Sequence, residues 1–149
     1  AMQLREIPST FYNDLRKDDQ QAMRHRPAAG EWSAIEVMGH MIDKISNWAT
    51  RVERIWHEEK PKLPGYDQDV EVTKHDYQHA DPAALRDQLA QQCERFASIV
   101  SDLPDSALQR QGIHGEFGPM TIQDCMKAVL DSVPEHLKQL QAAQVSYAK

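Results

Sequence analysis

The stretch that decides the fold is SAIEVMGHMIDKISNWATRVERIW, residues 33–56. It opens with Ser33 and Glu36 in the spacing of a capping box, where a hydroxyl caps the helix and a carboxylate follows three residues later. Apolar residues then recur at helical spacing and form one stripe. The stripe consists of Ile35, Met38, Ile42, Ile45, Ala49, Val52 and Trp56. The pattern predicts an amphipathic helix that ends before Pro61 and Pro64.

Three further segments show the same helical period. Near the start of the chain, Ile7, Phe11 and Leu15 recur every four residues. A third helix begins after Asp81, because Pro82 suits a first helical position. A fourth begins after TIQD, residues 121–124, which resembles a capping box. No segment indicates a strand, so the sequence predicts an all-α four-helix bundle.

Residues 59–80 connect the second and third predicted helices. This long loop is polar, and we expect a short helical piece near residues 72–79. Loops of this length in compact domains are often functional or mobile. The whole chain, residues 1–149, is expected to form one domain, with Ala1 before Met2 interpreted as a leftover of expression.

Composition excludes several classes of function. The net charge is −6, with no basic stripe, so a nucleic-acid partner is not expected. No apolar run is long enough to span a membrane, and no signal peptide is visible. Cys93 and Cys125 lie within apolar patterns and are interpreted as small core residues of an intracellular protein. The expected location is the cytoplasm.

The histidines do not predict a metal site by spacing alone. His136 falls on the apolar face of the last helix, and His40 falls nearly opposite the apolar stripe of the second. Periodicity therefore predicts a core His136 and a solvent-exposed His40. His75 and His79 have the i, i+4 spacing of a helical metal pair, but in a polar loop solvent exposure is the preferred interpretation. His114 lies in a glycine-rich loop, where an exposed ring is typical.

Three markers occur in one order along the chain. They are RPAAGEWSAIEVMGHMID at residues 26–43, HGEFGPMTIQDCM at 114–126 and EHLKQL at 135–140. Each is weakly specific alone, but together they resemble the DinB-like proteins of the DinB/YfiT superfamily. The resemblance implies a four-helix bundle of up-down-down-up connectivity that is often a homodimer.

The resemblance also implies a site. In metal-binding members, the residue matching His40 joins two histidines of the last helix, spaced HxxxH, around nickel, zinc or a similar ion. Here His136 matches the second of these, while Ser132 occupies the first position. A serine hydroxyl is a poor ligand for such ions. The candidates for a third ligand are Asp43, one turn from His40, and His114.

Two functions follow as hypotheses. Characterised relatives include S-transferases that use a low-molecular-weight thiol such as mycothiol, bacillithiol or glutathione. The first hypothesis is therefore a divalent-metal-dependent (Ni or Zn) thiol S-transferase-like enzyme acting on a small molecule. The alternative is a degenerate, metal-free bundle with a small-ligand-binding or scaffold role. In either case the expected pocket is formed by Ser132, Asn47 and Trp32, and neither nucleic acid nor a membrane is an expected partner.

Overall fold

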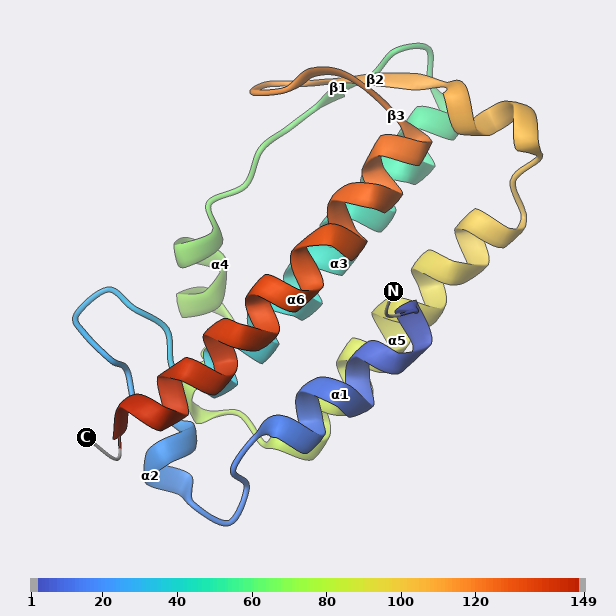
Figure 1. The fold of residues 1–149 in the computed structure, drawn as a ribbon. Helices are drawn as coiled ribbons and strands as arrows, with labels where there is room; N and C mark the ends of the chain where they lie inside the picture. Colours follow the sequence, from blue (N-terminus) through green and yellow to red (C-terminus); the bar gives the residue numbers. More distant parts are fainter. Residues whose placement is uncertain (1–2, 148–149) are drawn as a thin grey trace.

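The computed structural model describes residues 3–147. Four long helices form the bundle (Figure 1). They are α1 (Ile7–Asp14), α3 (Ala34–His57), α5 (Pro82–Ser101) and α6 (Ile122–Tyr147). Shorter elements are η1 (Leu4–Glu6), α2 (Gln20–Met23), α4 (Gln68–Lys74), η2 (Tyr77–His79) and η3 (Asp105–Gln109). The predicted four-helix bundle is therefore confirmed.

The three helix starts lie where the capping patterns place them. In α3, the Glu36 amide donates to Ser33 Oγ at 3.4 Å, and the Ser33 amide donates to Glu36 Oε1 at 3.1 Å. In α6, Thr121 and Asp124 exchange the equivalent bonds at 3.0 Å each. Asp81 accepts from the Ala84 amide in front of α5. Each cap satisfies backbone donors that the first helical turn leaves unpaired.

The direction of the helices explains the long connection. In Figure 1, α3 and α5 run one way along the bundle, and α1 and α6 run the other way. A chain leaving the end of α3 must therefore return along its length, about 36 Å for 24 residues, before α5 can begin. The connection contains α4 and η2. The predicted helical piece is split, because Asp76 adopts a left-handed φ of 49° between them.

The expectation that the chain has no strands is wrong. Three short strands, β1 (Lys62–Leu63), β2 (Gln111–His114) and β3 (Gly118–Thr121), form a small sheet beside the end of α3. β1 pairs with β2 in parallel, and β2 pairs with β3 as an antiparallel hairpin. Gly112 permits close packing, because a Cβ there would lie 2.8 Å from Ile55 Cγ1. Strands of two to four residues carry no alternation that a sequence pattern could detect.

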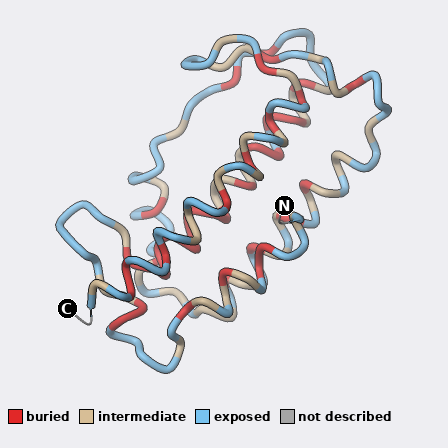
Figure 2. The backbone as a smooth tube through the Cα atoms, viewed as in Figure 1, coloured by how far each residue is buried: buried red, intermediate tan, exposed pale blue. Residues whose placement is uncertain are grey.

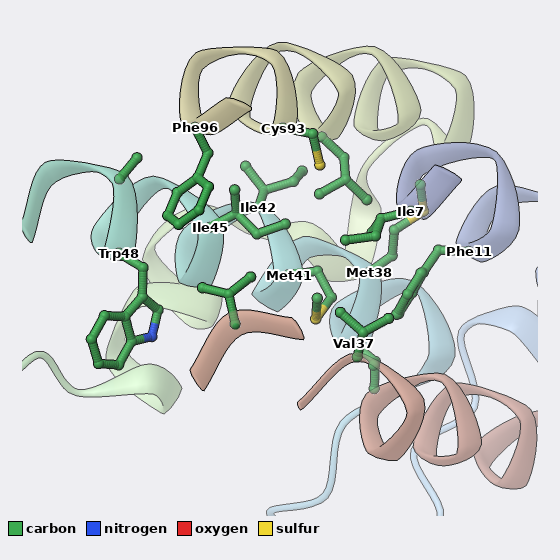
Figure 3. Packing of buried hydrophobic residues seen from close by; sticks show 14 of the residues in the cluster. Ile7, Phe11, Val37, Met38, Met41, Ile42, Ile45, Trp48, Cys93 and Phe96 are labelled. Atoms are coloured by element: carbon green, nitrogen blue, oxygen red, sulfur yellow. The ribbon is translucent and has the colours of Figure 1, made fainter. Parts of the chain in front are cut away.

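The core fills the space between α3 and its neighbours (Figures 2 and 3). Residues 34–42 of α3 are all buried, because α5, α6 and the α4–η2 segment pack around them. Cys93 and Cys125 are buried and free, as predicted. Burial raises the pKa of each thiol to about 12, which leaves both in the unreactive thiol form. Within residues 3–147, no helix combines the length and apolar character needed to cross a membrane.

Candidate functional site

His40 lies inside the bundle, which corrects the surface position that periodicity predicts. Its exposed fraction is 0 %. The prediction is wrong because it assumes one buried stripe, whereas the first half of α3 is covered on every side. Neither ring nitrogen of His40 has a hydrogen-bond partner among the described residues. Buried polar atoms are nearly always paired, so the lone pair of one ring nitrogen and the N–H of the other are both without a partner here.

Two aromatic rings contact His40. The ring of His136, from α6, lies 4.8 Å from it between centroids, at an interplanar angle of 69°. The ring of Trp32, from the loop before α3, lies 4.6 Å away at 39°. The structure thus brings together two of the histidines that the resemblance implies as metal ligands. We call His40 and His136 the histidine pair.

Gln139 determines which ring nitrogen of His136 carries the proton. Its Oε1 lies 3.2 Å from His136 Nδ1. An amide oxygen only accepts, so this contact places the proton on Nδ1 and leaves Nε2 with a free lone pair. Metal-binding histidines are commonly oriented by such an acceptor on the other ring nitrogen.

Both histidines of the pair are held neutral. Burial, with smaller effects from His136 and Lys44, lowers the pKa of His40 to about 3. Burial also lowers the pKa of His136, although the contact with Gln139 opposes the shift. Neutral imidazole is the form that binds metal ions. The pair therefore presents unprotonated nitrogen donors at neutral pH.

Ser132 and His114 do not complete the pair in this structure. Ser132 Oγ donates to the Val129 carbonyl at 2.8 Å, within its own helix. His114 lies in the β2–β3 hairpin, where its Nδ1 accepts from the backbone amides of Glu116 and Phe117 at 3.0 and 3.1 Å. Across residues 3–147, no group of three His, Cys, Asp or Glu is arranged to hold a metal ion.

Asp43, the other candidate for a third ligand, contacts different residues. Its Oδ1 accepts from the Tyr77 hydroxyl at 2.6 Å and lies 3.2 Å from His75 Nδ1. Tyr77 fits there because residue 39 is glycine: a Cβ at Gly39 would lie 2.1 Å from Tyr77 Cγ. Asn47, expected in the pocket, lines a hollow with Asp43 and His75.

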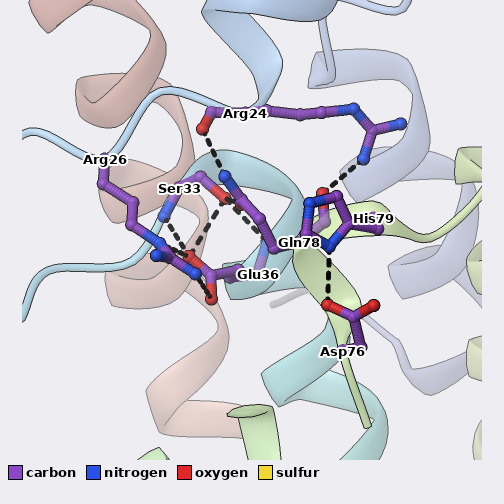
Figure 4. Close-up of polar contacts among 7 residues, drawn as sticks. All are labelled: Arg24, Arg26, Ser33, Glu36, Asp76, Gln78 and His79. Atoms are coloured by element: carbon purple, nitrogen blue, oxygen red, sulfur yellow. Dashed lines mark hydrogen bonds and ion pairs between the residues drawn. The ribbon is translucent and has the colours of Figure 1, made fainter.

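A polar network holds the Trp32 loop against η2 (Figure 4). The Arg26 guanidinium makes two bonds to the Glu36 carboxylate, at 2.8 and 3.0 Å. Ser33 Oγ donates to Gln78 Oε1, and Gln78 Nε2 donates to the Arg24 carbonyl at 2.7 Å. These contacts fix the loop before α3 and thereby the position of Trp32 over His40.

A hollow of about 550 Å³ lies next to residues that contact the histidine pair, although neither histidine lines it. Trp32 and Gln139 line it, and these are the residues that contact His40 and His136. Ala142, Ala143 and Ser146 of α6 form another wall. The hollow is large enough for a small molecule.

Sequence reasoning missed Gln139 and Tyr77. Gln139 lies three residues after His136, so the helical spacing of the two was available as a signal. Gly39 in the middle of a helix is a signal of a close contact, although not of its partner. The i, i+4 pair His75 and His79 does not share a helix face, because the helix breaks between them. His79 contacts Asp76 at 2.8 Å and is largely exposed.

Fold and site together define a four-helix bundle that holds two neutral histidines between its second and fourth long helices. The model of the DinB superfamily matches residues 4–140, and the chain belongs to this superfamily.

A solved structure shares the fold. YfiT from Bacillus subtilis superposes with a TM-score of 0.86 at 18 % sequence identity, covering 97 % of this chain and 83 % of that one. YfiT is described as a probable metal-dependent hydrolase with an unusual four-helix bundle topology. No curated protein matches the chain.

Proposed function

We propose that the chain is a divalent-metal-dependent enzyme that acts on a small molecule, with His40 and His136 as its protein ligands to nickel or zinc. One observation carries the proposal. The His40 imidazole is entirely buried, both of its nitrogens lack partners among the described residues, and it lies against a second neutral imidazole. Imidazole nitrogens suit ions of this type.

The donor set fits such an ion in part. Catalytic zinc sites usually have three protein ligands and one open position. The described residues supply two nitrogens here, which leaves the remaining positions to water and substrate. When bound, the ion supplies a Lewis acid that lowers the pKa of a water or thiol held beside it.

The residues around the pair have separate tasks. Trp32 covers His40 and excludes water from one side, and Gln139 keeps His136 Nε2 unprotonated. The hollow beside them would hold the small-molecule substrate. A low-molecular-weight thiol as second substrate gives an S-transferase, while water as nucleophile gives a hydrolase, the activity proposed for YfiT. The buried thiols of Cys93 and Cys125 are unsuited to act as the nucleophile. The homodimer remains a prediction.

The first test is metal binding by calorimetry and elemental analysis after incubation with nickel or zinc. We expect about one ion per chain, and loss of that ion in both His40→Ala and His136→Ala. His79→Ala is the matched control, since it removes a largely exposed imidazole elsewhere. Absence of stoichiometric metal from the wild-type chain would remove the proposal and favour the metal-free ligand-binding bundle.

A variant that should gain metal affinity tests the same site. Ser132 lies one helical turn before His136, so Ser132→His would offer a third imidazole. We expect zinc affinity to rise by roughly tenfold or more, since two ligands are too few for a tight structural site. Gln139→Leu should weaken binding by roughly tenfold, the usual effect of removing a residue that orients a ligand. Unchanged affinity in both variants would contradict the assignment.

A further inference from the structure

A second polar site lies between α3 and the α4–η2 segment. Two hollows, of about 360 and 340 Å³, share Asp43, Ser46 and His75 as lining residues. Neither His40 nor His136 lines them. The site is therefore separate from the histidine pair, and nothing in the proposed function uses it.

Asp43 is the centre of this site. Its side chain is only 10 % exposed. Tyr77 and His75 both lie against Oδ1, while Oδ2 is buried and has no hydrogen-bond partner among residues 3–147. Leaving a buried carboxylate oxygen unpaired costs free energy, so a bound donor would stabilise this arrangement.

Two carboxylates line the site. Asp43 is joined by Glu71, whose Oε2 lies 3.8 Å from His75 Nε2. Among the described residues, no lysine or arginine lines either hollow, but two arginines border them. Arg95, which is paired with Glu53, donates to the Ser46 carbonyl at 3.2 Å and to Thr50 Oγ1 at 2.9 Å, and Arg51 donates to the Pro64 carbonyl at 3.0 Å. A cationic ligand complements the two carboxylates, which no arginine contacts.

The remaining lining groups specify the kind of cation. Ser46 and Asn47 offer a hydroxyl and an amide oxygen, and Tyr66 offers an aromatic ring. The hydroxyl of Thr50 already accepts from Arg95 at 2.9 Å. An ammonium group has three donors for such oxygens and is attracted to an aromatic face.

We propose that the hollow between α3 and α4 binds a small molecule with a primary ammonium group, which pairs with Asp43 and Glu71. Tyr77, seated on Gly39, holds Asp43 in place for this contact. The site is independent of the histidine pair and does not rest on the metal-dependent activity.

The test is a titration of chelator-treated full chain, followed by the backbone amide signals in NMR spectra. Benzylamine is the probe, and benzyl alcohol and benzoate are its neutral and anionic counterparts. We expect saturable shifts at Ser46, Asn47 and His75 with benzylamine. Binding of the alcohol should be roughly tenfold weaker or more, the usual loss when a charged hydrogen bond is replaced.

Substitutions of Asp43 and Glu71 test whether these carboxylates bind the ammonium group. Asp43→Asn should weaken benzylamine binding roughly tenfold, because a buried charged contact is lost. Glu71→Gln should weaken it about threefold, as expected for a more exposed ion pair. Asp69→Asn, on the same helix as Glu71, is the control with equal change in net charge, and its carboxylate lines a different hollow. Should Asp43→Asn not fold, Glu71→Gln still measures the effect, since its side chain is 31 % exposed.

Several results would overturn the proposal. These are equal binding of the amine and the alcohol, shifts centred on Trp32 and Gln139, no saturable shift, or unchanged binding in Glu71→Gln. His136→Ala separates this proposal from the metal-dependent function, because it should abolish metal binding and leave benzylamine binding unchanged.

Discussion

Two histidines lie next to α3 but differ in their surroundings. His40 is a residue of this helix, and His75 contacts Asp43, which follows His40 by three residues. Aromatic rings cover His40, and its nitrogens find no partner among the described residues. His75 is 41 % exposed and lies against two carboxylates. The comparison shows that residue type alone does not decide a histidine's role. Burial keeps the His40 ring neutral, whereas the His75 ring is paired with carboxylates in a polar pocket.

The largest expected effect comes from the residue that makes room between the two sites. Gly39→Ala should destabilise the protein by about 3 kcal/mol, because the new Cβ would lie within 2.1–2.6 Å of three Tyr77 ring atoms and a packed interior cannot absorb the overlap. Urea denaturation measures the change. Gly115→Ala is the control, since a Cβ there meets nothing within 4 Å. Equal effects of the two substitutions would show that Tyr77 is not seated on Gly39.

Acidification should affect the two sites in opposite directions. The pKa of His40 is lowered to about 3, so below about pH 6.5 the unfolded chain binds a proton that the folded chain does not. Stability therefore falls as the pH falls through this window, by about 2 kcal/mol for His40 between pH 7 and pH 5 in metal-free protein. His40→Leu should remove this part of the dependence.

Asp43 should change the pH dependence of stability in the opposite direction. Burial raises its pKa, so its contribution to stability is present at low pH and is lost as the pH rises. Asp43→Asn should therefore make acid destabilisation steeper, while His40→Leu makes it shallower. Urea denaturation at several pH values checks both variants. If both changed the pH dependence in the same direction, the contrast between the two sites would be wrong.

A smaller effect is expected at the hydroxyl that orients Asp43. Tyr77→Phe removes a 2.6 Å hydrogen bond and should cost about 1.5 kcal/mol of stability. Tyr66→Phe is the matched control, because its hydroxyl makes no hydrogen bond to another described residue although the ring lines the same hollow as Asp43. Similar losses in the two variants would indicate that ring packing, and not the bond to Asp43, determines the effect.

Much of the fold could be predicted from local signals. Ser33, Asp81 and Thr121 cap their helices with side-chain bonds that span two or three residues, so short patterns reveal them. The length of the 59–80 connection likewise follows from two neighbouring helices that run in the same direction. Strand β1 could not be predicted, since its partner β2 lies about 50 residues away in the chain. Strands β2 and β3 form a local hairpin, but four residues each are too few for a detectable alternation.

The candidate site could be predicted only in part. His40 and His136 were identified through family resemblance, while helical periodicity alone placed His40 in solvent. Burial of His40 depends on Trp32 of the preceding loop and on His136 of the last helix, which pack against its ring. The bond from Tyr77 to Asp43 joins residues 34 positions apart, and no spacing rule connects them. Site geometry therefore depends on tertiary contacts that helix periodicity does not contain.

The most direct test of the central claim is the X-ray absorption spectrum of the zinc-loaded chain at the zinc edge. We predict scattering from two imidazole rings, with nitrogens at about 2.0–2.1 Å from the ion, and lighter oxygen or added thiol sulfur in the remaining positions. His136→Ala should lose one of the two imidazole contributions, and Ser132→His should add a third. A spectrum without imidazole scattering, or one unchanged by either substitution, would contradict the assignment of His40 and His136 as a metal centre.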